Sequence, residues 1–279
     1  MPIKGTKYKV QRTNYELSIS KAQIKQVRSL QQKKFRDELG LFVAEGDKCV
    51  EELQKGFELL YLYREGENAT RAEIEQMSGL QTPQGTIAVF RKPVLPLVPS
   101  LEERAGGEIF LVLDGVQNPG NLGTIIRTCD WFGVHDIVCS RDTADCYNPK
   151  VVQATMGALV RVRVHYTELP EWLEELKSSN EKLKIYGTLL DGKDMYEVLQ
   201  SEGRSYSKAV LQQSGLTGEA GHAVIIMGNE GNGISEEVRK FVTHPIRIPS
   251  YPKGTETSES LNVSIATAIV LAEFRRGEK

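Results

Sequence analysis

LVLDGVQNPGNLGTIIRTCDWFG, residues 111–133, reads as an apolar strand, then a turn rich in glycine and asparagine, then a helix. The expected strand ends at Asp114, and the expected helix begins near Asn121 and covers 122–132. In that helix Asn121, Thr124 and Thr128 recur at about one-turn spacing, and Arg127 lies in the same two turns. Spacing alone fits two interpretations equally: a binding loop leading into a helix, or a plain strand, turn and helix in which Arg127 pairs with a surface acid.

A second candidate loop follows an apolar, β-branched run over 223–227. Its sequence is MGNEGNGIS, residues 227–235. Glycines let backbone N–H groups approach a ligand closely, and a helix starting at Ser235 would offer its positive end. The helix begins only after the third glycine, and no Gly-Lys-Ser/Thr follows, so neither a dinucleotide-binding GxGxxG loop nor a phosphate loop fits. A tight turn without a ligand is the alternative.

A third polar segment is IRIPSYPKGTETSESLNVS, residues 246–264, which continues into an apolar helix expected over 260–276. We expect Ser258 or Ser260 to cap that helix, with Asn262 in its first turn. As plain structure this is a loop and a capped core helix, and capping explains Ser260 without any chemistry. It does not explain why three such loops follow apolar strands in the same half of the chain.

Strand-like and helix-like runs alternate from residue 108 onward. Alternation predicts an α/β fold with a mostly parallel sheet that is covered on both faces and binds ligands at the carboxyl ends of its strands. The expected strands are 109–113, 137–139, 160–164, 184–190, 223–227 and 246–248, and the expected helices are 122–132, 150–158, 169–178, 236–242 and 260–276.

The first part of the chain predicts a smaller α/β unit. A basic amphipathic helix over 21–38, capped by Ser20 and ended by Gly40, comes first. Strands at 41–44, 59–63 and 86–90 and helices at 46–55 and 71–77 follow, and prolines and paired glycines in 93–107 suit a linker. We therefore expect a flexible basic arm at 1–20, a small domain at 21–92, a linker at 93–107 and a larger domain at 108–279.

Charge is distributed unevenly along the chain. Residues 1–36 hold ten Lys and Arg and a single acid, Glu16, although the whole chain has a net charge of −2. A basic segment on an acidic body suits a polyanion such as RNA, because phosphate contacts release counterions. Charge alone fits a solvated tail as well.

Composition also argues against several classes of protein. The apolar runs are shorter than the roughly 20 residues that cross a bilayer, and the first residues lack the apolar core of a secretory signal. We therefore expect a cytoplasmic protein without a membrane segment. The cysteines form no C-x-x-C pair, so buried or idle thiols are expected rather than a metal or redox site; they are Cys49, Cys129, Cys139 and Cys146.

Taken together, the three segments resemble the motifs of the SpoU/TrmH family of RNA 2'-O-ribose methyltransferases, within the SPOUT superfamily. The pattern N-x-G-x-x-x-R is matched by Asn121, Gly123 and Arg127, G-x-E-G-x-G-[IM] by 228–234, and S-L-N-V-S by 260–264. Their order and separation are more specific than any one motif. Residues 20–92 also resemble the substrate-binding domain often fused to this family, which is itself similar to RNA-binding ribosomal proteins.

The resemblance implies an α/β trefoil knot in the larger domain, through which the last helix threads, and an obligate homodimer with the site at the interface. It implies S-adenosylmethionine as methyl donor, RNA as substrate and no metal, and the extra N-terminal domain favours ribosomal over transfer RNA. By the same resemblance the cofactor-binding residues are Thr188, Leu189, Gly192, Gly228, Asn229, Ile248 and Leu261. The catalytic residues are Asn121, Arg127, Glu230, Ser260 and Asn262.

The family assigns Arg127 the activation of the ribose 2'-hydroxyl. Because a guanidinium is effectively always protonated, we interpret Arg127 as a fixed positive charge that stabilises the nascent alkoxide and grips the adjoining phosphate, while the proton passes to phosphate or water. Asn121 is expected to orient Arg127 or the ribose, and Ser260 and Asn262 to hold the loop and the substrate. Glu230 has two candidate roles: supporting the glycine loop or contacting Arg127 across the interface.

Two other classes of function are alternatives. The first is a catalytically inactive RNA-binding protein of the same fold, against which the presence of all five catalytic residues counts. The second is a nucleotide-dependent oxidoreductase or NTPase, whose phosphate-loop patterns the sequence lacks. The loop 250–259 is a few residues longer than the family's usual connection, and we expect it to alter substrate fit rather than chemistry.

Overall fold

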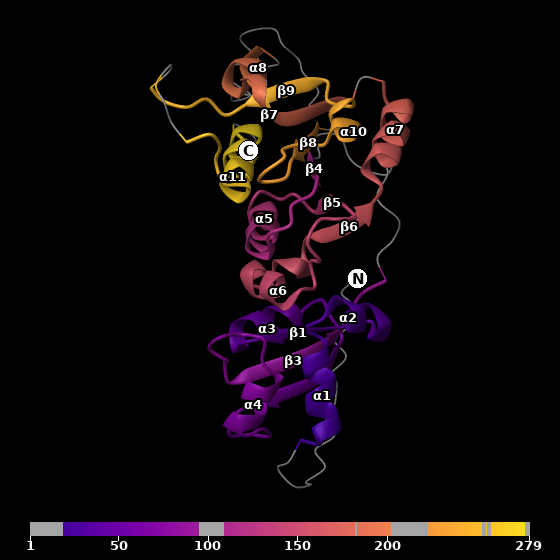
Figure 1. Ribbon diagram of the computed structural model, residues 1–279, viewed down its shortest axis with the longest axis vertical. Coiled ribbons are helices and arrows are strands. Elements are labelled where there is room, and N and C mark those ends of the chain that lie inside the picture. The colour runs from indigo at the N-terminus through magenta and orange to yellow at the C-terminus, as the bar shows by residue number, and fades with distance from the viewer. Residues whose placement is uncertain are drawn as a thin grey trace, which may run out of the picture.

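The computed structural model describes residues 19–94, 109–181, 183–201, 223–252, 255 and 258–276. Nearly all of the expected basic arm at 1–20, and most of the expected linker at 93–107, lie outside the described residues. The described elements form two groups that stack end to end, the indigo and purple N-terminal group below the magenta to yellow C-terminal group in Figure 1.

The N-terminal group is a three-stranded antiparallel sheet with helices, in the strand order β1-β3-β2. Local sequence explains where its helices start, because Ser20 and Thr70 each form a capping box with a residue three positions later. Its elements are α1 (Lys21–Ser29), α2 (Lys33–Leu39), β1 (Leu41–Glu45), α3 (Asp47–Leu53), β2 (Leu59–Arg64), α4 (Arg71–Met77) and β3 (Thr86–Arg91).

The single helix expected over 21–38 is wrong, because the structure has two helices there. α1 ends at Ser29, and the backbone N–H groups of Leu30 and Gln31 donate three residues back, as in a tightened last turn. The carbonyl groups of Leu30 and Gln31 then accept hydrogen bonds from the Arg36 guanidinium instead of continuing a helix. A side chain further along the chain therefore breaks a helix that amphipathic periodicity predicted to continue.

The C-terminal group is a six-stranded parallel sheet in the order β6-β5-β4-β8-β7-β9, with helices packed against it (Figure 1). This confirms the predicted fold class: α/β with a parallel sheet and a smaller α/β domain. The elements are β4 (Ile109–Leu113), α5 (Pro119–Trp131), β5 (Asp136–Ser140), α6 (Pro149–Thr155), the 3-10 helix η1 (Ala158–Val160), β6 (Arg163–Thr167), α7 (Leu169–Ser179), β7 (Lys184–Asp194), α8 (Met195–Ser201), β8 (Ala223–Met227), α10 (Glu236–Arg239), β9 (His244–Arg247) and α11 (Val263–Phe274).

Several boundaries in this group differ from the sequence prediction: β7 continues to Asp194, α6 ends at Thr155, α10 ends at Arg239 and β9 covers His244–Arg247. Three further differences have a local cause. The strand expected at 160–164 starts at Arg163, because Gly157 adopts a positive φ of 89° and leads into η1. The last helix starts at Val263 rather than at 260, since Asn262 caps it in place of Ser258 or Ser260. α5 starts at Pro119, earlier than expected, because a proline is favoured at the first helical position.

Apolar packing continues from one group into the other. Phe42 of β1 lies 4.9 Å from Tyr147, centroid to centroid, and the Cys49 thiol of α3 lies 3.8 Å from the Val152 carbonyl oxygen of α6. A Cβ built on Gly56 would come within 2.6 Å of the Val160 side chain, so the Gly56 backbone packs directly against that side chain. The small domain is thus packed onto α6 and η1 rather than loosely tethered.

Candidate active site

The loops after β4 and β8 leave the sheet side by side, because these strands are parallel neighbours paired up to their last residues. The Asp114 carboxylate accepts a hydrogen bond from the Ser235 backbone N–H at 2.7 Å. The Asn229 amide donates to the Gly115 carbonyl oxygen at 2.6 Å. The first two of the three polar segments are therefore joined at the carboxyl edge of the sheet.

The loop after β8 is a closed turn built around Asn229. The Asn229 Oδ1 atom accepts from the backbone N–H groups of Gly231 at 2.8 Å and Asn232 at 3.0 Å. A Cβ on Gly228 would lie 2.2 Å from the backbone carbon of Gly233, so the turn closes only with glycine at 228. The Asn229 backbone also pairs with Gly233, donating at 2.8 Å and accepting at 3.0 Å, so both the side chain and the backbone of this residue stabilise the turn.

Asn121 links all three segments through its side-chain amide. Its Nδ2 group donates to the Glu230 carboxylate at 2.7 Å, and its Oδ1 atom accepts from Asn262 Nδ2 at 3.0 Å. Asn262 in turn caps α11: its Oδ1 atom accepts from the Ser264 backbone at 3.0 Å, the Ser264 hydroxyl at 2.6 Å and the Ile265 backbone at 3.4 Å. These three residues, all predicted to be catalytic, are thus in direct contact. Along the chain, Glu230 lies 109 positions and Asn262 lies 141 positions after Asn121.

Arg127 lies on α5, about one and two-thirds turns after Asn121, and its side chain is exposed. Within the described part of the chain it makes no hydrogen bond, and no carboxylate lies within 4.0 Å of its guanidinium. Ile125 and Ile126 point into the core, while Trp131, one turn beyond Arg127, is 85% exposed. No acid among the described residues therefore pairs with Arg127.

Two other predicted residues have surroundings that the sequence did not predict. Glu230 accepts a hydrogen bond from Asn121 within one chain, a contact beyond the two roles considered for it. Ser260 is exposed and forms no hydrogen bond with another described residue, so the described contacts of the S-L-N-V-S motif run through Asn262 and Ser264.

The cysteines lie apart from this site and are all buried and free, as expected for idle thiols. Burial raises the pKa of the Cys49 thiol to about 11 and that of Cys146 to about 12, and it holds the pKa values of Cys129 and Cys139 well above the usual range. A nucleophilic cysteine needs the thiolate form near neutral pH. The chemistry of this protein therefore does not run through its thiols.

Comparison with known proteins agrees with these motifs. The model of the SpoU rRNA methylase family matches residues 108–272, and that of the MRM3-like substrate binding domain matches residues 21–73. The 23S rRNA (guanosine(2553)-2'-O)-methyltransferase RlmP of Bacillus subtilis is 30% identical over 277 residues, covering 92% of this chain and 98% of its own. The chain belongs to the SpoU rRNA methylase family.

Solved structures of similar proteins share the fold over nearly the whole chain. A TrmH-family RNA methyltransferase from Porphyromonas gingivalis is 33% identical, with a TM-score of 0.74 over 93% of this chain and 99% of that one. An AdoMet-bound rRNA methyltransferase from Sinorhizobium meliloti is 27% identical, with a TM-score of 0.72 over 94% of this chain and 97% of that one. Both confirm the SpoU architecture predicted from the motifs.

The residues predicted to bind the cofactor of this SpoU protein gather at neighbouring strand ends. Thr188, Leu189 and Gly192 lie on β7, between β8 and β9 in the sheet, with Gly228 and Asn229 directly after β8 and Ile248 after β9; Leu261 precedes Asn262.

The chemical character of these predicted cofactor-binding residues suits S-adenosylmethionine. Leu189 and Ile248 are half-buried, Leu261 is 48% exposed, and no member carries a charge. A Cβ on Gly192 would lie 2.5 Å from the Ile246 backbone, so β7 and β9 can close together only with glycine there. Apolar side chains beside backbone groups are what a neutral adenosine requires.

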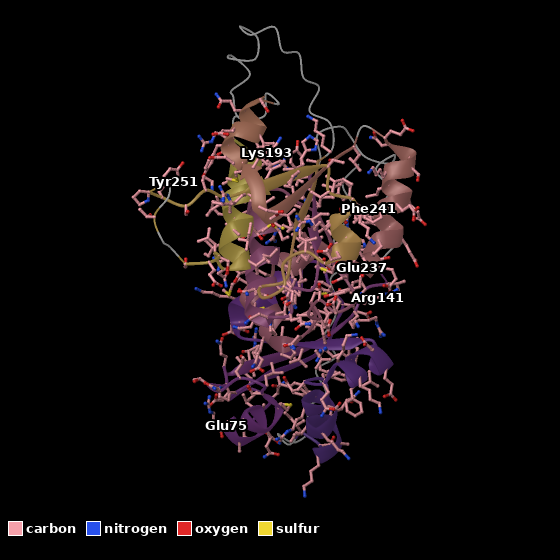
Figure 2. The ribbon with its side chains drawn as sticks, turned by 45° about the horizontal axis from the view of Figure 1, so that its top comes forward. Glu75, Arg141, Lys193, Glu237, Phe241 and Tyr251 are labelled. Carbon is pink, nitrogen blue, oxygen red and sulfur yellow. The ribbon has the colours of Figure 1, made fainter. Side chains whose placement is uncertain are left out.

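A hollow next to these residues lies between α8 and the edge strand β9, and it shares only Gly192 with the predicted cofactor set. Its lining includes Lys193, Glu197, His244 and Arg247. Figure 2 shows Lys193 at this end of the molecule and Tyr251, which is 67% exposed, on the chain that projects between β9 and α11.

Sequence reasoning missed several residues that build the SpoU site. Asn118 caps α5 by accepting from the backbone N–H groups of Gly120 and Asn121, which fixes where Asn121 begins its turn. The Asn-Pro pair at 118–119 is a recognisable helix start. For Asp114 as the acceptor from Ser235, no local pattern would have named a partner 121 positions away. Ser264 donates to Asn262 only two positions before it, as part of the cap of α11.

No helix in the described part of the chain is long and apolar enough to cross a membrane. Among the described residues, no cluster of His, Cys, Asp and Glu could hold a metal ion.

Proposed function

We propose that this protein methylates the ribose 2'-hydroxyl of a guanosine in 23S ribosomal RNA, with S-adenosylmethionine as methyl donor. The observation that carries the proposal is the hydrogen-bonded chain from Glu230 through Asn121 to Asn262, which joins the three SpoU motifs at the start of the helix that carries Arg127. The choice of RNA rests on the nearly full-length similarity to RlmP of Bacillus subtilis. The proposal includes a cytoplasmic location, where we expect the RNA substrate to be found.

The methyl group is supplied from the sulfonium of S-adenosylmethionine, and Thr188, Leu189, Gly192, Gly228, Asn229, Ile248 and Leu261 would hold that cofactor. What the protein must add is a nucleophile, because a ribose hydroxyl is a weak nucleophile near neutral pH. A positive charge about 4 Å from the developing alkoxide stabilises it by roughly 4 kcal/mol at an effective dielectric constant of about 20. In this proposal Arg127, which has no partner among the described residues, supplies this charge and binds the adjoining phosphate, while the hydroxyl proton leaves to phosphate or water.

Asn121 and its two partners hold the start of α5 in place. Because Asn121 donates to Glu230 and accepts from Asn262, its amide has a fixed orientation, and the helix that carries Arg127 is fastened at its N-terminus to both neighbouring segments. Preorganised groups of this kind avoid reorganisation when charge develops. We therefore assign Asn121, Glu230 and Asn262 to orienting Arg127 and the ribose, and Ser260 to the surface that meets the substrate.

We also propose that the protein acts as a homodimer through one face of α11. This helix is apolar on nearly all sides, and its inner residues such as Val270 and Leu271 are buried. Its other face carries Ile265, which is 52% exposed, and Leu261, just before the helix, is 48% exposed. A helix that is apolar all round is normally buried all round, so a second copy is the occupant that fits the predicted interfacial site.

Oligomeric state can be measured by analytical ultracentrifugation. Ile265→Asp is expected to yield folded monomers with little methyl transfer, while Tyr61→Asp, at a 43% exposed aromatic residue of β2, should leave the dimer intact. A wild-type monomer at micromolar concentration would contradict the dimer proposal.

The reaction can be tested with purified protein, isotopically labelled S-adenosylmethionine and a 23S rRNA transcript. We expect 2'-O-methylguanosine in the digested product by mass spectrometry, none with the Arg127→Ala variant, and none on 16S rRNA or tRNA transcripts. Binding of S-adenosylmethionine by calorimetry without transfer to any RNA would favour the catalytically inactive alternative. Mapping ribose methylation in a strain that lacks the protein would identify the nucleotide.

A further inference from the structure

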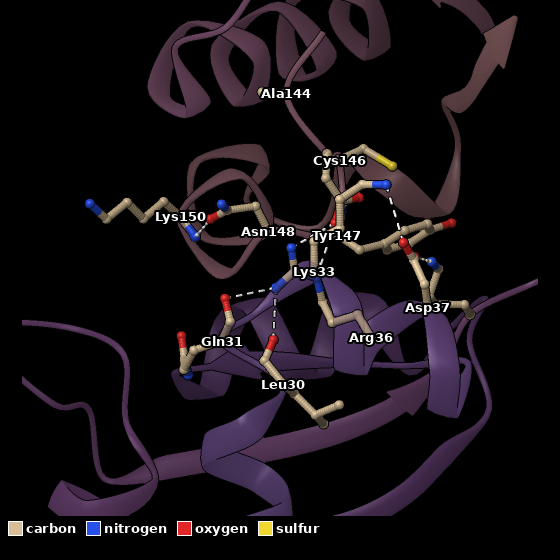
Figure 3. Close-up of polar contacts among 12 residues, drawn as sticks. Leu30, Gln31, Lys33, Arg36, Asp37, Ala144, Cys146, Tyr147, Asn148 and Lys150 are labelled. Atoms are coloured by element: carbon tan, nitrogen blue, oxygen red, sulfur yellow. Dashed lines mark hydrogen bonds and ion pairs between the residues drawn. The ribbon is translucent and has the colours of Figure 1, made fainter. Parts of the chain in front are cut away.

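Arg36 of α2 is an arginine that is almost completely buried, at 1% exposure, where the two domains meet. Its guanidinium donates four hydrogen bonds to three acceptor atoms on two sides. Nη1 donates to the carbonyl oxygens of Leu30 at 2.8 Å and Gln31 at 2.9 Å, while Nε and Nη2 donate to one carboxylate oxygen of Asp145 at 3.0 and 2.7 Å (Figure 3). One side chain thus binds the end of α1 and the methyltransferase domain at once.

The contact with α1 determines where that helix stops and which way it points. The last carbonyl groups of a helix have no partner within the helix, so they need an external donor. Arg36 supplies it to Leu30 and Gln31, in the break between α1 and α2. The angle between α1 and α2 therefore depends on the planar arrangement of the N–H donors of this guanidinium.

The contact with Asp145 ties the same unit to the larger domain. Asp145 lies between β5 and α6, with a side chain only 9% exposed, and its second oxygen accepts from the Tyr147 backbone at 3.0 Å. The Tyr147 ring packs on Phe42, and the Lys92 ammonium lies 5.2 Å above it. Buried ion pairs add little net stability but select one arrangement over others, which is the effect relevant here.

α1 presents a stripe of positive charge to solvent. Lys21, Lys25 and Arg28 are exposed and lie at positions i, i+4 and i+7, so they share one face, while Val27 on the other side is buried. Phosphates bound along this stripe would lie at a fixed distance and direction from Arg127 only if α1 is held rigidly against the methyltransferase domain.

We propose that Arg36, through Asp145, is a positioning residue that sets the basic face of α1 relative to Arg127 and so determines which nucleotide of a bound RNA reaches the methyl donor. This deepens the proposed function and rests on it. The apolar contacts of Phe42 and Tyr147 keep the domains together, and the ion pair fixes their mutual orientation. Selection of the target nucleotide is then partly a property of the domain interface, remote from the reacting atoms.

The test compares Arg36→Lys and Asp145→Asn with a matched control, Arg71→Lys. Lysine keeps the charge but lacks the planar fork that reaches both carbonyls and the carboxylate. Arg71 also pairs with carboxylates in the small domain, but with Glu65 and Glu75 on its own exposed surface. Asp145→Asn keeps the side-chain shape and provides a second variant if Arg36→Lys folds poorly.

Orientation is measured by electron–electron distance between spin labels on Gln26→Cys in α1 and Glu174→Cys in α7, both exposed positions, while the native thiols are buried. The labelled protein is mixed with an excess of unlabelled protein, so that a dimer carries labels on one chain only. We expect one narrow distance distribution in the wild type and the control, and a broadened one in both interface variants. With 23S rRNA we expect kcat to fall at least tenfold, methylation to spread to neighbouring nucleotides, and the Kd for S-adenosylmethionine to change less than twofold.

Unchanged distances and unchanged target choice in both variants would overturn the proposal, and so would an equal loss of S-adenosylmethionine binding, because the effect would then be general unfolding. Hydroxyl-radical footprinting of the bound RNA separates this proposal from the proposed function. If the wild type binds RNA but transfers no methyl group, the proposed function fails. The positioning role then stands if the footprint shifts in the interface variants and falls if it does not.

Discussion

The Asn262 side chain has two separable effects, and two substitutions distinguish them. Its Oδ1 atom caps α11, and its Nδ2 group donates to Asn121 at 3.0 Å. Asn262→Ala removes both: loss of the cap costs about 1 kcal/mol, and loss of an uncharged hydrogen bond costs about 1 kcal/mol more. We therefore expect Asn262→Ala to lower the free energy of unfolding by about 2 kcal/mol.

Asn262→Asp keeps the cap and loses only the donor. A carboxylate still accepts from the Ser264 and Ile265 backbones, and its charge is favourable at a helix N-terminus by roughly 0.3–1 kcal/mol. The free energy of unfolding of Asn262→Asp should therefore lie within about 1 kcal/mol of the wild-type value. Its methyl-transfer rate should fall at least about fivefold, because the contact with Asn121, worth about 1 kcal/mol, is lost.

Both variants are measured by urea unfolding at one protein concentration, from the shift in midpoint at unchanged slope, and by single-turnover methylation of 23S rRNA. A wild-type rate in Asn262→Asp would show that the link to Asn121 does not serve catalysis. Wild-type stability in Asn262→Ala would show that the cap reasoning is wrong.

Three further predictions follow from the same structure. Arg127→Ala should lower kcat by up to roughly 10³-fold, the equivalent of about 4 kcal/mol, while the Kd for S-adenosylmethionine, measured by calorimetry, changes only a few fold. An equal loss of cofactor binding would make Arg127 structural. The native protein should show no fast reaction with a thiol reagent at pH 8, because burial raises the pKa of every thiol, to about 11 for Cys49. All four thiols should react after denaturation, and one fast-reacting thiol in the native protein would contradict the prediction. Deleting residues 1–20 should weaken RNA binding and flatten the dependence of log Kd on log salt concentration, whereas an unchanged slope would make the arm a solvated tail.

Much of the local structure could be predicted, because its causes lie within a few residues. The bounds of α4, β4 and β8 agree with the sequence prediction to the residue, since caps and apolar periodicity there act on near neighbours. The Ser20 cap was confirmed for the same reason. Where a side chain is engaged by a distant partner, as Arg36 is by Asp145, local reasoning failed: the single helix expected over 21–38 is two helices.

In the candidate site, too, the identity of the residues could be predicted from the sequence but their contacts could not. The three motifs identified the family, and with it Asn121, Glu230 and Asn262, from their types and order in the chain. That Asn121 contacts both partners, and that Arg127 has no described partner, could not be predicted from spacing, because the order of strands in a sheet is not encoded in the period of any one strand.

For this protein, then, the sequence by itself determined the elements, the parallel sheet and the family, because those depend on local patterning and on motif identity. Only the tertiary structure decided which residues meet. Asn121 reaches a partner 109 positions away and another 141 positions away, and Arg36 breaks a helix while pairing with Asp145, also 109 positions away. The physical reason is that a hydrogen bond depends on distance in space, and the fold, not separation along the chain, brings these groups within 3 Å.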